Sequence, residues 1–459
     1  MSHVATQSAT EIRDLIRARK LSVVEAVEAS LTRVDQLNPT INAIVTLNPR
    51  AMDDARVLDA WLAKGEDPGP LCGLTVGIKD VTQVASLRTT FGSPIYADHV
   101  PDDDAVVVRR LRDAGAVILG KTNTPEFAAG GNTFNEVFGR TRNPWDTTKS
   151  AGGSTGGGAA ALVTGMIHLA EGTDLGGSLR IPASFCGVVG LRPSVGLVPT
   201  HPTDWSWDTL QVTGPMARTA EDVALMLQSI AGATEHSPLR QPVAGRDFVA
   251  AVKAGPRRGA RIAYVSDPTR IGIEPDIERI CRDAAFGLKD AAFDLAVEEI
   301  DVDLSPARAA FLTLRGLWFV THMAPRMDKA AQFGTNVGNN VRAGQATTTE
   351  QLAAAEQERN RLWHVFKQLF SRFDYVVTPT MAVPPFPVEQ NYPDSIAGKP
   401  MQTYVDWIAP TFVLSLTGLP VASVPCGRDS GGMPVGLQIV SRPGDEEAAL
   451  SLAAVVRYG

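Results

Sequence analysis

Cysteine is scarce in this chain of 459 residues, and long apolar runs are missing from it. The four cysteines are Cys72, Cys186, Cys281 and Cys426, and none forms a Cys-x-x-Cys pair or joins histidines at the spacing of a metal site. We therefore expect buried, reduced thiols, with no structural disulfide and no structural zinc, as in cytoplasmic proteins.

Membrane and nucleic-acid partners are also disfavoured by what the chain lacks. No apolar run approaches the roughly 18 residues that a spanning helix needs. The start, MSHVATQSATEIRDLIRARK, has no apolar segment typical of a signal peptide. The net charge of −7 argues against a surface that binds nucleic acid. These features favour a cytoplasmic protein that acts on a small molecule.

Helical and strand patterns alternate along the first part of the chain. Apolar residues recur at helical spacing in Thr10–Lys20 and Ser22–Leu37, with Thr10 and Ser22 as expected N-caps. Gly73–Val81 is typical of a buried strand, and the helix Asp103–Asp113 precedes a strand at Ala116–Gly120. This order predicts an α/β fold with a largely parallel sheet covered by helices.

Two further segments complete the domain organisation that we expect. Residues 1–65 form an N-terminal helical segment, and the Pro-, Gly- and Arg-rich residues 232–258 form an exposed connector. Residues 305–370 are expected to be mostly helical, with an interruption near 334–344.

The most informative stretch holds two serines, Ser154 and Ser178, each directly after a Gly-Gly pair. Glycine allows the backbone to approach a reacting atom and to adopt positive φ at little cost. A hydroxyl on such a turn, surrounded by free N–H groups, is what acyl transfer requires. One such turn would be an ordinary loop, but two of them downstream of a buried lysine favour catalysis.

Lys79 is the expected base, because it stands in the apolar strand VGIKDV. Lysine is uncommon in such a strand unless it pairs with an acid or takes part in catalysis. To act as a base it must lose its proton near working pH. This requires that its pKa fall by roughly 3 units from about 10.4, and burial can produce such a shift. The alternatives are an ion pair of Lys79 with Asp80 or another acid, and a histidine as the base. None of the seven histidines lies in the motifs, and His168 between the serines is expected to be structural.

These motifs resemble those of the amidase signature family. AGGSTGGGAAA around Ser154 is similar to the family's GGSSGG motif, and GTDLGGSLRIPASFCG around Ser178 is similar to its second serine motif almost letter for letter. GLTVGIKD resembles the strand that carries the family's lysine, and the resemblance extends from about Thr10 to Ala453. It implies one α/β domain over residues 1–459, with a large central mixed, largely parallel sheet covered by helices on both faces.

The resemblance also implies a mechanism without a metal or an organic cofactor. Lys79 would take a proton through Ser154, whose peptide bond would be cis, and Ser178 would attack the carbonyl. The backbone N–H groups of the nucleophile loop would form the oxyanion hole: Leu175, Gly176, Gly177 and Ser178. Asp174 and Arg180 flank this loop, and we expect a structural ion pair between them.

Departures from the family pattern separate two functions. The loop 130–135 reads GGNTFN, and Phe134 stands where the A subunits of tRNA-dependent amidotransferases typically have an acid. This favours a stand-alone amidase, a monomer or a homodimer, over an amidotransferase component with glutaminase activity. A non-catalytic scaffold is a third alternative, against which the intact Lys79, Ser154 and Ser178 argue.

The substrate pocket is expected to be apolar. Its predicted lining is Gly130, Gly131, Phe134, Trp205 and Trp207, with Leu175 beside the nucleophile and Phe138, Trp318, Tyr404 and Trp407 as further aromatic candidates. No arginine is identified that would hold an acid, since Arg180 is assigned to structure and the orientation of Arg142 and Arg192 is open. We therefore expect hydrolysis of neutral aromatic or alkyl amides in preference to carboxylate-bearing ones.

Overall fold

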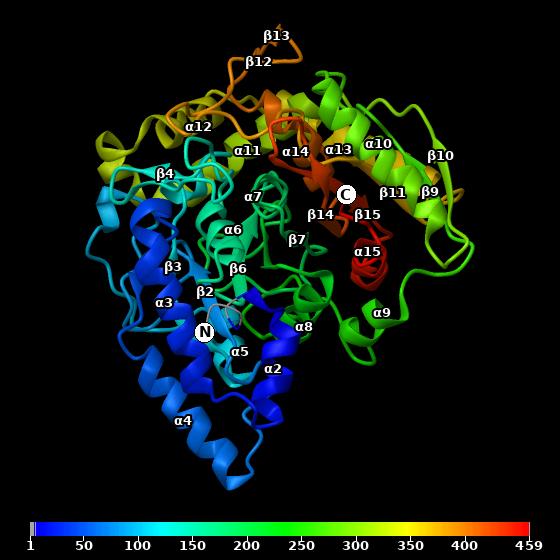
Figure 1. The fold of residues 1–459 in the computed structure, drawn as a ribbon. Helices are drawn as coiled ribbons and strands as arrows, with labels where there is room; N and C mark the ends of the chain where they lie inside the picture. The colour runs from blue at the N-terminus through cyan, green and yellow to red at the C-terminus, as the bar shows by residue number, and fades with distance from the viewer. Residues whose placement is uncertain (1–3, 5, 459) are drawn as a thin grey trace.

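An eleven-stranded sheet forms the centre of the computed structural model, which describes residues 4 and 6–458 (Figure 1). In spatial order its strands are β1 (Ile44–Leu47), β3 (Val117–Thr122), β2 (Thr75–Lys79), β6 (Leu169–Asp174), β8 (Val212–Ala217), β7 (Val189–Arg192), β14 (Val421–Arg428), β15 (Pro434–Val440), β11 (Tyr375–Pro379), β9 (Arg261–Tyr264) and β10 (Ala296–Glu299). In this part of the chain, no helix combines the length and hydropathy needed to cross a bilayer.

The sheet is mixed. Parallel pairs join β3, β2 and β6 in one block and β11, β9 and β10 in another. Between the blocks, β6, β8, β7, β14, β15 and β11 pair antiparallel, as β1 does with β3 at the edge. The short turn at 429–433 explains the antiparallel pairing of β14 with β15, since parallel neighbours need a longer crossover. The large mixed sheet is confirmed, and its parallel part is these two blocks.

Helices cover both faces of the sheet. Every residue of β2, β3, β6 and β8 is buried, and successive side chains of a strand point to opposite faces. The helices are α2 (Ala9–Arg17), α3 (Val23–Ile41), α4 (Ala51–Lys64), α5 (Val106–Asp113), α6 (Gly156–Val163), α7 (Arg180–Cys186), α8 (Ala220–Ile230), α9 (Phe248–Ala254), α10 (Pro275–Gly287), α11 (Ala307–Met323), α12 (Thr335–Gln345), α13 (Thr349–Leu369), α14 (Ala409–Ser415) and α15 (Glu446–Ala453).

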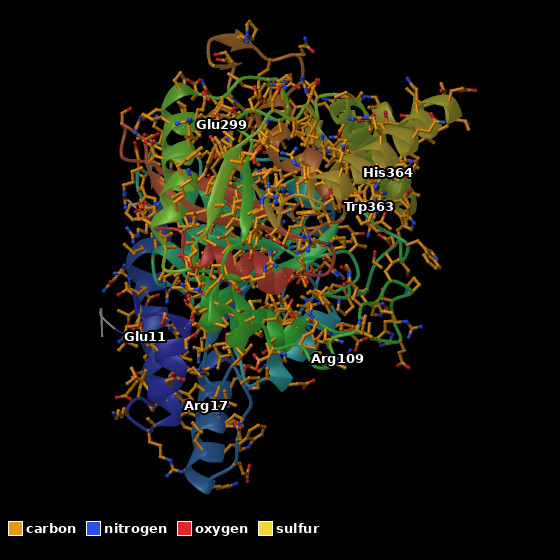
Figure 2. All side chains as sticks on the ribbon, turned by 90° about the vertical axis from the view of Figure 1, so that its right-hand side faces the viewer. Glu11, Arg17, Arg109, Glu299, Trp363 and His364 are labelled. Carbon is orange, nitrogen blue, oxygen red and sulfur yellow. The ribbon has the colours of Figure 1, made fainter. Side chains whose placement is uncertain are left out.

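The N-terminal helices differ from the prediction in two details. Ser22 caps α3 as expected, but the cap of α2 is Ser8, and the Thr10 hydroxyl instead donates to Asp222 at 2.9 Å. The predicted helical segment 1–65 also contains β1, which pairs with the sheet. Figure 2 shows Glu11 of α2 on the left side of the view and Trp363 of α13 on the right.

Two predicted irregular regions contain helices. The expected connector 232–258 ends in α9, whose Phe248 and Val252 are buried. The expected interruption near 334–344 is wrong, because α12 occupies it. Its glycines allow α12 to approach α11 closely: a Cβ on Gly316 of α11 would lie only 2.9 Å from the Cα of Gly344. This close contact fixes α11, one face of which lines the cavity described below.

Candidate active site

Lys79 is the last residue of β2 and is fully buried. Its Nζ lies 2.6 Å from Ser154 Oγ and 2.9 Å from Thr173 Oγ1. Burial lowers the pKa of Lys79 to about 7, although the carboxylates of Glu171 and Asp174 act in the opposite direction. A large share of this amine is therefore neutral near pH 7, so that it can accept a proton from the hydroxyl that it touches.

Ser154 reaches Lys79 from the loop that precedes α6. The peptide bond between Gly153 and Ser154 is cis, as the resemblance implied. The glycine beside it is required by space, since a Cβ on Gly153 would lie 3.0 Å from the backbone carbons of Gly131 and Asn132. The Thr155 N–H donates to the Ser178 carbonyl at 3.2 Å and so connects the two serine loops.

Asp80 does not pair with Lys79, so the ion-pair alternative is wrong for this residue. The Asp80 carboxylate accepts hydrogen bonds from Thr90, and its other oxygen lies 3.9 Å from Nζ of Lys121, a second buried lysine. The N–H of Lys79 donates instead to Glu171 at 3.1 Å. Sequence reasoning missed Lys121, although it also stands in a buried strand, in VILGKT.

The described histidines are not placed to serve as the base. His168 is fully buried; its Nδ1 accepts from the Thr75 N–H at 3.1 Å, and burial lowers its pKa to about 3. His364 projects from the outer surface of α13 (Figure 2). His201 and His322 line a cavity near the site, but neither forms a hydrogen bond with either serine.

The nucleophile loop follows β6. In this loop Leu175 and Ser178 keep partial exposure, while Gly176 and Gly177 are buried. The Gly177 N–H donates to Asp174 Oδ1 at 2.8 Å, which removes it from the predicted oxyanion hole. Within the described chain no hydrogen bond occupies the backbone N–H of Leu175, Gly176 or Ser178. Three of the four predicted donors are therefore free to bind a developing oxyanion.

Asp174 and Arg180 form the structural ion pair that was expected, and Arg192 joins it. Arg180 Nη2 lies 3.0 Å and Arg192 Nη1 3.3 Å from Asp174 Oδ1, and all three side chains are fully buried. Burial acts to raise the pKa of Asp174, but the two guanidinium groups outweigh it and hold this pKa below its usual range. Arg180 also donates to Gln438 at 2.7 Å, so this cluster ties the nucleophile loop to β15.

Two connected cavities lead to the serines. An inner cavity of about 30 Å³ is lined by Ser154, Ser178, Leu175 and Gly176 together with side chains of α11. An outer cavity of about 210 Å³ adjoins it. The two share five lining residues: Phe127, Ala128, Thr173, Gln211 and Trp318. The outer cavity is thus the neighbour of the one that the nucleophile loop lines.

Comparison with known proteins agrees with this geometry. The amidase family model matches residues 25–450. An acylamidase from Rhodococcus erythropolis is 35% identical over 97% of this chain and 94% of its own length. A solved bacterial aryl acylamidase of the amidase signature family superposes with a TM-score of 0.92 at 26% identity, covering 99% of this chain and 96% of that one.

The chain belongs to the amidase signature family. It is therefore an amidase, a hydrolase of carbon–nitrogen bonds. The A subunit of the glutamyl-tRNA(Gln) amidotransferase from Carboxydothermus hydrogenoformans is 34% identical over 97% of this chain and 96% of its own length. The two kinds of relative are equally similar in sequence, so the pocket must distinguish between their functions.

The amidase pocket contains only part of the predicted lining. Gly130 and Gly131 line the inner cavity as expected. Phe134 lies outside both cavities, because it pairs in a short hairpin and its ring lies 4.6 Å from the Arg140 guanidinium. Trp207 is 65% exposed, and Trp205 packs beside His322 behind the outer wall. Their loop does border the outer cavity, through residues 199–204, but neither tryptophan side chain lines it.

The missed lining residues come mainly from two places. Phe127 lies beside the predicted glycines, and α11 supplies the largest group: Phe311, Arg315, Trp318 and Phe319. Single residues from other elements complete the lining: Ala128, Thr173, Ile181, Gln211 and Ile408. Trp318 was named only as one aromatic among several. Sequence reasoning identified no arginine that would hold an acid, and it did not consider Arg315, which lines the inner cavity. The spacing of these four residues on one helical face is a signal that could have been read.

Neither Arg142 nor Arg192 lines the two cavities. The sequence had left the orientation of both side chains open. Arg142 lies 3.3 Å from Glu389 at the surface, and Arg192 belongs to the Asp174 cluster.

The four cysteines are buried free thiols, with the sulfurs of Cys281 and Cys426 4.0 Å apart. Among the described residues, no three or more His, Cys, Asp or Glu side chains gather as metal ligands would.

Proposed function

We propose that this amidase hydrolyses a small amide through an acyl-enzyme on Ser178, with Lys79 as the base and Ser154 as the relay between them. The observation that carries the proposal is the 2.6 Å contact between the buried Lys79 amine and Ser154 Oγ, beside a cavity that Ser178 also lines. A serine hydroxyl needs such a base to become a nucleophile.

The proposed steps conserve protons at each stage. Ser178 Oγ attacks the carbonyl carbon while its proton passes to Ser154 Oγ, and the proton of Ser154 passes to Lys79 Nζ. The negative oxygen accepts from the N–H groups of Leu175, Gly176 and Ser178. Collapse breaks the C–N bond, and the leaving nitrogen takes the proton back through Ser154. Water then attacks the acyl-enzyme by the same relay and releases the acid and free Ser178.

The acyl group that fits this cavity has an aromatic or alkyl part. Phe127, Phe311, Trp318 and Phe319 supply apolar surface, and Leu175 borders the nucleophile. Burial of apolar area contributes about 25 cal/mol per Å², so a ring or alkyl chain gains binding over a methyl group. An acylamidase relative and an aryl acylamidase neighbour are consistent with such substrates.

Ser178→Ala tests the proposal directly. We expect hydrolysis of an anilide or benzamide to fall by at least about 10³-fold, because the variant has no nucleophile. Ser206→Ala, which alters an exposed serine outside both cavities, is the matched control and should keep wild-type activity. If Ser178→Ala retains more than a few per cent of the rate, the assignment of the nucleophile is wrong.

Glutaminase activity within a tRNA-dependent amidotransferase is the second candidate function, favoured by the 34% identity with the Carboxydothermus protein. Phe134 weighs against it. The two functions are separated by assaying glutamine against an anilide with the isolated chain. Light scattering of the purified protein tests the proposed monomer or homodimer, and a stable second polypeptide would favour the amidotransferase.

We also propose that the chain acts as a single domain in the cytoplasm. The support for one domain is the sheet, which collects strands from Ile44 to Val440. The support for the location is the four free, buried thiols, which suit a reducing compartment. Limited proteolysis that released a stable, folded fragment would contradict the first proposal.

A further inference from the structure

Arg315 lies on the wall of the inner cavity, on the helical face that also carries Phe311, Trp318 and Phe319. It is only 6% exposed. Its guanidinium carbon lies 5.3 Å from the ring centre of Phe319 and 5.4 Å from that of Tyr404. Aromatic faces attract the cation but leave its five N–H donors without acceptors.

The charge of Arg315 has no counterpart in the described chain. No carboxylate lies within 4.0 Å of its guanidinium, and the guanidinium donates no hydrogen bond there. Neighbouring arginines are all paired: Arg308 with Asp406 at 2.9 Å, Arg326 with Asp204 at 2.7 Å and Arg180 with Asp174 at 3.0 Å. The donors of Arg315 are therefore open to a ligand in the inner cavity, which Ser178 also lines.

We propose that Arg315 binds a carboxylate of the substrate, and so selects amides that carry an acid a short chain away from the scissile carbonyl. The guanidinium fork matches the two oxygens of a carboxylate in a way that a single carbonyl oxygen does not. The chain between the two groups must be short, because Arg315 and Ser178 line the same small cavity. This inference rests on the proposed function of Ser178, and it reverses the preference for neutral amides predicted from the sequence.

Binding to the Ser178→Ala protein tests the inference without turnover. Calorimetry compares three pairs that differ in one group, a carboxylate against a methyl: malonamate with propionamide, succinamate with butyramide, and glutaramate with valeramide. We expect at least one acid to bind about tenfold tighter or more than its neutral partner. Ser178→Ala/Arg315→Met should remove this preference, and Ser178→Ala/Arg315→Lys should keep part of it, since charge remains but the fork is lost.

Arg308→Met, made in the same Ser178→Ala background, is the matched control, because Arg308 lies on the same helix but pairs with Asp406 outside the cavity. It should keep the acid preference. Circular dichroism and the unfolding temperature check that each variant folds; where Arg315→Met does not fold, the lysine variant decides. The inference is overturned if no acid binds better than its neutral partner, or if a folded Arg315→Met variant keeps the preference.

Turnover of the same pairs separates this inference from the proposed function. If Ser178→Ala abolishes hydrolysis but wild-type kcat/KM shows no acid preference, the role of Arg315 fails and the nucleophile stands. If hydrolysis survives in Ser178→Ala, the proposed function fails, whatever Arg315 binds.

Discussion

Lys79 and Lys121 are two buried lysines on neighbouring parallel strands, and their surroundings differ in kind. In the register of β2 with β3, Lys121 lies opposite Ile78, one position from Lys79. Both side chains are fully buried. Lys79 touches the hydroxyls of Ser154 and Thr173, which both line the inner cavity. Lys121 donates to the carbonyl of Thr82 and to the hydroxyl of Thr89, and it lies 3.9 Å from the carboxylate of Asp80.

The comparison of Lys79 with Lys121 shows that burial of a lysine is not sufficient to make it a catalytic base. Burial lowers the pKa of both lysines, and for Lys121 the Asp80 carboxylate acts against this effect. Lys121 contacts an acid, a backbone carbonyl and the hydroxyl of Thr89, but Thr89 lines neither cavity. Lys79 contacts a hydroxyl that leads into the cavity. The partner atoms, and not the depth of burial, separate the two roles.

The largest expected effect comes from exchanging each lysine for methionine. Lys79→Met should lower kcat/KM for an amide by about 10²–10⁴-fold and leave the fold intact, because the proton acceptor is lost. Lys121→Met should instead lower the free energy of unfolding by about 3–5 kcal/mol, because it leaves the Asp80 charge unpaired. Steady-state kinetics and urea unfolding of both variants give the two readouts.

The distinction between the two lysines is wrong if Lys121→Met loses activity and Lys79→Met loses stability, or if both variants lose activity to the same extent. A Lys121→Met protein that folds but has lost as much activity as Lys79→Met would place both amines in the reaction.

The pH profile should show a smaller effect, about tenfold per pH unit on the acid side. The neutral form of Lys79 is required, and burial depresses its pKa to about 7, so kcat/KM should rise with pH through about 7 and then level off. Glu171 and Asp174 are the acids that face this amine, and both oppose the depression. Folded Lys121→Met should keep the inflection. A rate that is highest at pH 5 and falls with rising pH would remove Lys79 from the role of base.

Thr173→Val should have the smallest effect of the three, about tenfold in kcat/KM. The Thr173 hydroxyl accepts from the Lys79 amine at 2.9 Å, and losing such a bond costs about 1–2 kcal/mol. Because this bond favours the protonated amine, its loss should also move the pH inflection downward. Thr89→Val, which removes the hydroxyl 3.0 Å from Lys121 Nζ, is the matched control and should leave the inflection in place. An unchanged inflection in Thr173→Val would show that this hydroxyl does not tune Lys79.

The sequence predicted the reacting groups better than their surroundings. Ser154 and Ser178 stand out because Gly-Gly turns are local signals, and Lys79 stands out as a charge in an apolar strand. The cis bond at Ser154 and the mixed sheet came from the family resemblance. The loss of the Gly177 N–H to Asp174 is also local, but the direction in which a carboxylate turns back onto its own loop is not visible in a motif.

The pocket was predicted poorly because distant elements build it. Phe311, Arg315, Trp318 and Phe319 lie on α11, and which face of that helix meets the nucleophile depends on how α12 packs against it. Trp205 and Trp207 follow the catalytic loop closely in sequence, but their loop turns them away from Ser178. Contacts between segments far apart in the chain decide which face of α11 lines the pocket and where the two tryptophans point. Periodicity within one segment does not reveal such contacts.

The Asp174 cluster has a consequence for how the enzyme is made. Arg180, next to the nucleophile loop, donates to Thr411 O and to Gln438 Oε1, which lies 258 positions later in the chain. A ribosome makes the chain from the N-terminus, so both serines and Lys79 emerge long before these partners do. Until β15 has been synthesised, the nascent chain contains its reactive groups without the contacts that hold them in place. The anchoring of the nucleophile loop is thus completed only near the end of synthesis.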